Sequence, residues 1–296
     1  MAWLHAVYFL DQNRGWIAGG NGTLLNTVDG GVTWNKTQFT NRDSLSDVYF
    51  SDSANGWLLV QRDLFNLKPN ERPSYLLTTQ DGGLTWRPIS LNTADANTRF
   101  TRMVFTDSQH GWVFGETGVV FATSDGGVRW MPQRSATKHL LLGAAFANNN
   151  RALIVGAGAT IMQSDDGLNW RLSATSKDAH DRFNAVAIAG PSMWAAGNGG
   201  RIITSNNGGR SWSAQYSNVN ADLLDIKFLD AREGWAVGAQ GTLLHTNDAG
   251  LHWRAEAIGS SHGLERLFII DRSHIWAVGF GGTILRFGET SAPRLR

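Results

Sequence analysis

Six short polar turns recur along this 296-residue chain, and each holds a side chain of the kind used in acid–base chemistry. The six aligned residues are Asp29, Asp81, Asp125, Asp165, Asn207 and Asp248. A glycosidase needs two carboxyl groups about 5–9.5 Å apart across one substrate. Equivalent turns in a repeated sequence instead lie on separate units. In such a turn Asp or Asn accepts backbone N–H groups and glycine supplies a positive φ, so we predict a structural role.

A second set of charged residues stands at one aligned position, in the first predicted strand of four units. Its members are Asp47, Arg102, Asp225 and Arg266. Each aspartate is followed by an arginine in the next unit, and the first strand is expected to be the innermost. Buried charges are seldom left unpaired, which favours ion pairs between units. The alternative is a ligand or partner site at the mouth of a central channel.

Residues 61–74 form an insertion that only the second unit carries. It contains Arg62, Lys68 and Arg72, and we expect it between the second and third strands of that unit. In a propeller this connection emerges on the face that also holds the inter-blade connections. The three basic side chains are therefore predicted to crown that face. A long loop on one repeat indicates either partner contact or neutral decoration.

The composition argues against several classes of function. The chain has 26 basic and 25 acidic residues, so its balance favours no nucleic-acid partner. It has no cysteine, and its eight histidines lack metal-ligand spacing, so we expect no metal, cofactor or catalytic residue. No apolar run approaches the roughly 20 residues that span a bilayer. No basic and apolar leader precedes the first strand pattern, and no signal peptide is expected in this chain.

The elements that carry these residues are repeated. A tryptophan or its equivalent recurs at positions 16, 57, 112, 153, 194, 235 and 276, and the intervals are 41, 55, 41, 41, 41 and 41 residues. Each of the first six is followed by a turn such as Thr27-Val28-Asp29-Gly30-Gly31-Val32-Thr33-Trp34. Between these marks lie short alternating apolar runs, enough for four strands in each unit.

A repeat of about 41 residues with four strands predicts an all-β, seven-bladed β-propeller of four antiparallel strands per blade. The polar turns fall between strands 3 and 4, and residues 1–296 are expected to form one domain. Closure of the ring leaves two alternatives, because the seventh unit lacks the final turn and tryptophan. Either the N-terminus is truncated, or residues 288–296 form the fourth strand.

The turns resemble the Asp-boxes of bacterial neuraminidase repeats. Together with Gly15-Trp16 and the copy from Gly234 to Trp253, they make the chain similar to the seven-bladed photosystem II stability/assembly factor family. That resemblance implies an extracytoplasmic protein, in the periplasm or thylakoid lumen, that binds assembling membrane subunits through an arginine-rich face. It assigns no individual residue of this chain to that face.

We therefore expect a non-catalytic scaffold that binds a protein partner, such as a subunit of a photosynthetic-type membrane complex, and that is itself monomeric. Its excess of arginine over lysine suits planar, bidentate recognition. The alternative is a glycan-active or glycan-binding propeller, because Asp-boxes also occur in sialidases and xyloglucanases. The four tyrosines of the chain are few for a sialidase centre, which needs a tyrosine nucleophile.

Overall fold

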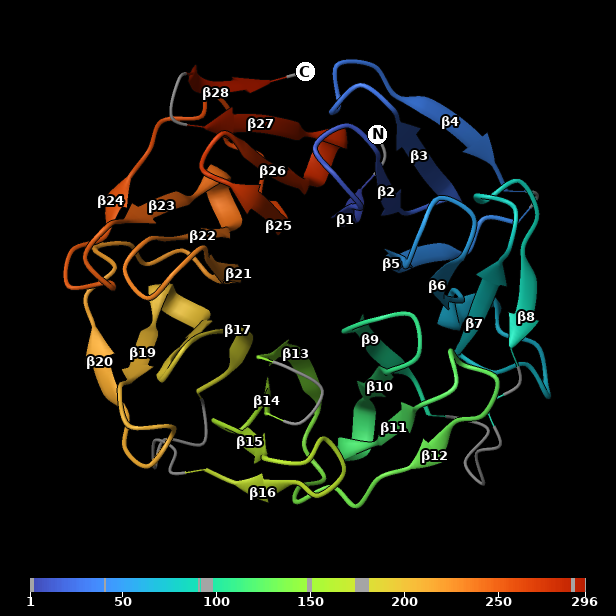
Figure 1. Cartoon of the computed structure of the whole chain (residues 1–296), viewed down its shortest axis with the longest axis horizontal. Coiled ribbons are helices and arrows are strands. Elements are labelled where there is room, and N and C mark those ends of the chain that lie inside the picture. Colours follow the sequence, from blue (N-terminus) through green and yellow to red (C-terminus); the bar gives the residue numbers. More distant parts are fainter. Residues whose placement is uncertain are drawn as a thin grey trace.

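The computed structural model describes residues 3–39, 41–89, 91, 98–147, 151–173, 181–288 and 291–295. These residues form seven four-stranded antiparallel sheets arranged as blades around a central axis (Figure 1). The first strand of every blade is innermost and the fourth is outermost, as Figure 1 shows for β1 and β4. The fold predicted from the repeat, a seven-bladed β-propeller, is confirmed.

The strands of the first four blades follow the predicted units. Blade 1 contains β1 (Leu4–Phe9), β2 (Gly15–Gly19), β3 (Thr23–Thr27) and β4 (Asn35–Gln38). Blade 2 contains β5 (Ser44–Phe50), β6 (Gly56–Gln61), β7 (Ser74–Thr79) and β8 (Arg87–Ile89). Blade 3 contains β9 (Phe100–Phe105), β10 (Gly111–Gly115), β11 (Val120–Thr123) and β12 (Met131–Pro132). Blade 4 contains β13 (Leu141–Phe146), β14 (Ala152–Gly156), β15 (Ile161–Ser164) and β16 (Arg171–Leu172).

The last three blades repeat the pattern. Blade 5 contains β17 (Phe183–Ala189), β18 (Ser192–Gly197), β19 (Ile202–Ser205) and β20 (Ser213–Gln215). Blade 6 contains β21 (Leu223–Phe228), β22 (Gly234–Gly238), β23 (Leu243–Thr246) and β24 (Arg254–Ala255). Blade 7 contains β25 (Leu264–Asp271), β26 (His274–Gly279), β27 (Ile284–Gly288) and β28 (Ser291–Leu295). Short 3-10 turns lie between second and third strands: η1 (Leu64–Asn66), η2 (Glu116–Gly118), η3 (Asn198–Gly200), η4 (Ala239–Gly241) and η5 (Phe280–Gly282).

The repeated tryptophans hold neighbouring blades together. Trp194 of β18 is fully buried and stacks on Phe228 of the next blade, with ring centroids 3.6 Å apart. Its indole Nε1 also donates a hydrogen bond to the carbonyl oxygen of Ala249 in that blade's Asp-box, at 3.0 Å. A stacked ring and a satisfied indole N–H explain why the same position is aromatic in most repeats.

The Asp-box turns show how the aspartate stabilises a tight hairpin. Asp29 accepts hydrogen bonds from the Thr27 hydroxyl at 2.7 Å and from the Thr33 backbone N–H at 2.9 Å. Gly30 and Gly31 take φ values of 71° and 84°, a region that favours glycine. Asp81, Asp125, Asn207 and Asp248 make the equivalent contacts in their own turns.

Blade 4 departs from the predicted alignment. Asp166, and not Asp165, accepts the turn N–H groups of Leu168 and Asn169, at 2.9 and 2.7 Å. Asp165 is exposed and instead forms an ion pair with Arg171 at 2.7 Å. This turn is one residue shorter than the others. Counting back from the tryptophan therefore selects the wrong member of two adjacent aspartates.

The ring closes without a strand shared between the two ends of the chain. Strand β28 pairs with β27, so residues near the C-terminus supply the fourth strand of blade 7. Blades 1 and 7 then meet as two complete sheets, which lie side by side in Figure 1. Phe9 stacks on Trp276 across this seam, with ring centroids 3.6 Å apart, and the Trp276 Nε1 donates to the Gly30 carbonyl oxygen.

Candidate functional site

The innermost strand of every blade contains a β-bulge near its start. In blade 2 the pairing with β6 skips from Leu45 to Asp47, and the other six blades show the same shift in register. A bulge leaves one residue unpaired and re-aims the side chains around it. The bulged residues of blades 1, 2, 3 and 7 line one pocket at the axis: His5, Ser46, Thr101 and Glu265.

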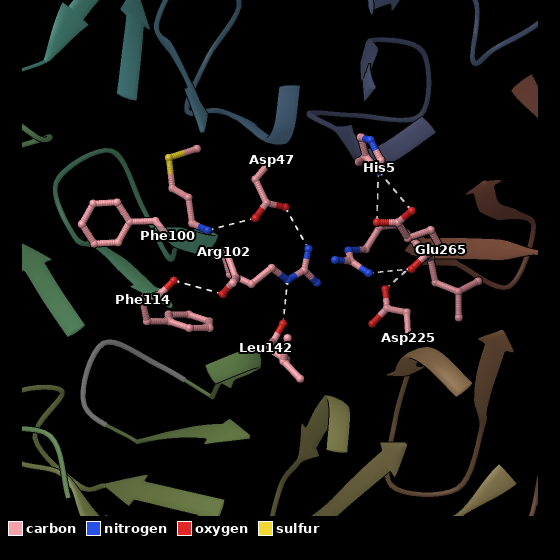
Figure 2. A network of polar contacts seen from close by, with 12 residues as sticks. His5, Asp47, Phe100, Arg102, Phe114, Leu142, Asp225 and Glu265 are labelled. Atoms are coloured by element: carbon pink, nitrogen blue, oxygen red, sulfur yellow. Dashed lines mark hydrogen bonds and ion pairs between the residues drawn. The ribbon is translucent and has the colours of Figure 1, made fainter. Parts of the chain in front are cut away.

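The residue after the bulge carries the first aligned ion pair. The Arg102 Nη1 donates to the Asp47 carboxylate at 3.1 Å, and both side chains are largely buried, at 11% and 13% exposure. Asp47 also accepts the backbone N–H of Met103, at 2.9 Å, and Arg102 donates its Nε to the Leu142 carbonyl oxygen (Figure 2). One aspartate therefore links blade 2 to the side chain and the backbone of blade 3.

The second aligned pair is arranged differently. Asp225, whose side chain is 2% exposed, accepts the backbone N–H of Leu267 in the next blade at 2.9 Å and lies 3.7 Å from the Lys227 ammonium. Arg266 donates its Nη1 to the carbonyl oxygen of Glu265 at 2.7 Å. Desolvation lowers the pKa of Arg266, and the charge of Arg102 lowers it further. The positive charges of Arg102 and Arg266 therefore repel each other across the axis.

A third charged contact joins blades 7 and 1 beside these residues. The His5 Nδ1 lies 3.1 Å from the Glu265 carboxylate (Figure 2). Burial raises the pKa of Glu265, but the hydrogen bond to His5 and the nearby arginines lower it overall. Glu265 is thus held as a carboxylate within the group of charges around the axis.

Of these axial residues, His5, Glu265 and Arg266 form the floor of a larger hollow, which we call the axial pocket. Its volume is about 680 Å³. The basic residues of its wall are Arg42, Arg62, Arg99 and Arg266, and its acidic residues are Asp63 and Glu265. Large apolar side chains complete the wall: Trp3, Leu64, Phe65 and Phe280. Positive charge beside exposed aromatic rings suits the recognition of an acidic and apolar partner surface.

The insertion lies between β6 and β7, as predicted, and its tip is apolar. Leu64 and Phe65 of η1 are 50% and 99% exposed, and the Asp63 carboxylate accepts the Phe65 N–H to cap this turn. Within the described residues few other aromatic side chains are so open to solvent. An exposed aromatic side chain at a loop tip is typical of a protein contact.

The three basic residues that were predicted to crown the face differ in their contacts. Arg62 stacks over Tyr75 at 4.3 Å and donates to the Arg72 carbonyl oxygen, while Arg72 donates to the Leu91 carbonyl oxygen at 2.7 Å. Both therefore anchor the insertion to its own blade. Lys68 is exposed. Arg42 and Arg99, which the sequence reasoning missed, also line the pocket, and they could have been found from their positions just before an innermost strand.

The acidic groups at the axis are engaged in contacts within the protein. Over the ranges that the structure describes, no three His, Asp or Glu side chains are placed to hold a metal ion. The aspartates at the axis are each committed to backbone N–H groups and cationic side chains. No helix among the described residues is long and apolar enough to cross a bilayer.

Comparison with known proteins places these features in a family. The family model described as "Photosynthesis system II assembly factor YCF48" matches residues 2–94, 37–139, 132–220 and 212–286. Among curated proteins, the photosystem II stability/assembly factor HCF136 of Arabidopsis thaliana is 24% identical over 298 residues, which cover 76% of this chain and 70% of the relative.

Two solved structures share the propeller fold. One is described as YCF48 bound to D1 peptide, with a TM-score of 0.79, 20% identity, and coverage of 97% of this chain and 92% of the other. An ancestral GH74 enzyme has a TM-score of 0.73 and 13% identity, and the match covers 98% of this chain but 46% of the enzyme. Identities this low show the fold alone. The family model spans nearly the whole chain, and the protein therefore belongs to the photosynthesis system II assembly factor YCF48 family.

Proposed function

We propose that this protein is a non-catalytic scaffold that binds an exposed segment of a partner protein in the axial pocket, during assembly of a membrane complex. The observation that carries the proposal is the pocket wall, where four arginines adjoin an exposed aromatic tip. Arginine and aromatic residues are enriched at the centres of protein interfaces. The relatives named as photosystem II assembly factors support the choice of partner class.

The family also supports an extracytoplasmic location, and the proposal includes a monomeric chain. A scaffold that holds a subunit of a membrane complex must reach the part of that subunit outside the bilayer. The pocket opens on the face of the insertion, so one propeller presents one such site. Of the residues predicted to bind a partner, Arg62 and Arg266 line this pocket, whereas Asp47, Arg102 and Asp225 join neighbouring blades around the axis.

The test is affinity capture with the tagged full-length chain from detergent-solubilised membranes and from soluble extract of its own source, followed by mass spectrometry. We expect membrane-complex subunits to be enriched. Phe65→Ser should reduce their capture about tenfold, since Phe65 is fully exposed and its loss does not disturb the core. Leu84→Ser is the matched control, because Leu84 is 83% exposed at an Asp-box tip.

Charge reversal at Arg62 and Arg72 would be a poorer test, because both side chains bond backbone carbonyl groups of their own blade. The Phe65 variant avoids that problem. Equal capture by Phe65→Ser and the unaltered chain would remove the insertion tip from the proposal. Release of sugar from sialosides or β-glucans by the pure protein would overturn the scaffold proposal in favour of a glycan-active propeller.

A further inference from the structure

Two guanidinium groups of the axial pocket are left incompletely bonded by the protein. Arg266 donates its Nη1 to the Glu265 carbonyl oxygen, but its Nε is buried and has no partner among the described residues. Arg99 donates its Nη2 to the Gln61 side-chain oxygen, and its Nε is likewise buried without an acceptor. A buried N–H group without an acceptor is unfavourable, so its presence in a pocket wall points to a missing acceptor.

The charges of the pocket indicate which kind of acceptor is missing. The innermost charges are evenly matched: Arg102, Arg266 and Lys227 face Asp47, Asp225 and Glu265. The rim adds three cations, Arg42, Arg62 and Arg99, and two anions: Asp63, and Asp43, whose carboxylate lies 4.0 Å from the Arg62 Nε. The surplus positive charge therefore lies at the rim, and an anionic acceptor between rim and floor would be attracted more strongly than a neutral one.

We propose that the axial pocket binds a carboxylate group, held between Arg99 at the rim and Arg266 at the floor. Guanidinium donors are planar and match the two oxygens of a carboxylate. Exposed Phe65 and Phe280 lie along the same wall, so the remainder of the ligand meets aromatic surface. The inference rests on the proposed function, because the carboxylate belongs to an acidic residue of the bound partner segment. A free small carboxylate offers the same chemistry from another source.

The first experiment uses the free full-length protein, so that it stands apart from partner capture. The side-chain Nε–H signals of ¹⁵N-labelled arginine are followed while sodium acetate is added, with sodium chloride as the control for ionic strength. We expect acetate to shift the Arg99 and Arg266 signals in a saturable manner, and Arg99→Gln to weaken this response about tenfold. Arg210→Gln, at an exposed Asp-box position, should leave the response unchanged. Shifts that chloride reproduces would overturn the proposal.

The second experiment identifies the source of the carboxylate. Two blocked peptides, alike except that one carries an aspartate and the other an asparagine, are titrated into the protein. The aspartate peptide should bind about tenfold more tightly, and Arg99→Gln should abolish the difference. Equal binding of the two peptides would overturn the assignment to a partner segment. Arg266→Gln removes a cation that compensates the Asp225 and Glu265 carboxylates, so a folding defect in that variant is checked against Arg99→Gln at the rim.

Discussion

The interface between blades 5 and 6 and the interface between blades 4 and 5 solve the same packing problem with different side chains. In the first, Trp194 stacks on Phe228 and donates to the Ala249 carbonyl oxygen. In the second, the equivalent position is Leu153, which is fully buried in an apolar cluster that includes Ile161 and Phe183. The repeat therefore requires a large buried apolar side chain here, and the aromatic stack is an addition to that requirement.

The two interfaces also use different side chains for their hydrogen bonds to the next Asp-box. At the interface of blades 4 and 5, Ser173 donates its hydroxyl to the Gly209 carbonyl oxygen at 2.5 Å and accepts the indole N–H of Trp212 at 3.2 Å. At the interface of blades 5 and 6 the equivalent residue, Gln215, makes both contacts with its amide: it donates to the Ala249 carbonyl oxygen at 2.9 Å and accepts the Trp253 indole N–H at 3.2 Å. A hydroxyl therefore replaces an amide in this link, while Leu153 has no N–H to take the place of the Trp194 indole. The Asp-box of blade 5 also uses Asn207, where blade 6 uses Asp248. Each degenerate repeat keeps the geometry of the link while changing its chemistry.

Removing the aromatic link should have the largest effect on stability. Trp194→Ala deletes a fully buried indole together with its stack and its hydrogen bond, and we expect it to lower the free energy of unfolding by about 3–5 kcal/mol. Leu153→Ala should cost less, because a smaller side chain is lost and neither a ring stack nor a hydrogen bond goes with it. Urea denaturation of both variants measures the difference, and a greater loss in Leu153→Ala would contradict the comparison.

The second largest effect on stability is expected at the inner end of an interface, where the Asp47–Arg102 ion pair joins blades 2 and 3. Asp47→Ala leaves the Arg102 guanidinium and the Met103 N–H without their acceptor, and we expect a loss of about 3 kcal/mol in the free energy of unfolding. At the aligned position of blade 4 the chain has Gly143 in place of the charge. Asp47→Asn is the matched variant, since it keeps one acceptor oxygen. Equal stability of Asp47→Ala and the unaltered chain in urea would show that the Asp47–Arg102 ion pair does not stabilise the fold.

The shortened Asp-box of blade 4 allows a sharper test between neighbouring residues. Asp166→Ala removes the acceptor of two backbone N–H groups and should cost about 1 kcal/mol in thermal or urea unfolding. Asp165→Ala removes only an exposed ion pair and should change stability very little. If Asp165→Ala were the more destabilised variant, Asp165 would be the turn acceptor, as the alignment on the tryptophan predicts.

The smallest expected effect is a difference in acid stability between the Asp-boxes of blades 5 and 6. Burial raises the pKa of Asp248, but hydrogen bonds from His252 outweigh it and lower the pKa to about 2. Because the folded-state pKa is depressed, this carboxylate contributes stability above its ordinary value of 3.8 and loses it as the pH falls toward 2. Asp248→Asn should therefore flatten acid unfolding between those values, and Asn207→Asp should steepen it. A titration of the Asp248 carboxyl signal by NMR with a midpoint near 3.8 would contradict the shift.

The repeat was sufficient to predict the architecture, because each unit has to pack between two neighbours and the tryptophan positions number the units. Asp166 was missed because an alignment with one residue deleted cannot distinguish adjacent aspartates. The bulged residues His5 and Glu265 were missed for a different reason. A bulge inserts one residue and shifts the alternation of buried and exposed side chains by one, so a strict period-two pattern does not show which side chain turns toward the axis.

The candidate site was predicted only in part for a related reason. The sequence located the insertion and its charges, but it did not indicate that Arg62 and Arg72 bond their own blade while Phe65 projects into solvent. Such choices depend on carbonyl groups brought close by the fold, as with the Leu91 carbonyl oxygen. The pocket wall also combines residues from blades 1, 2, 3 and 7, which the chain separates by more than 200 positions.

The seam between the first and last blades has a mechanical consequence. Because each of these blades is a complete sheet, the seam is built from the same kinds of contact as the other joints, with Phe9 and Trp276 in the role that Phe228 and Trp194 play elsewhere. A pulling force applied across the ring would meet side-chain packing at every joint and no continuous strand at any of them. Under force the molecule should therefore unfold one whole blade at a time.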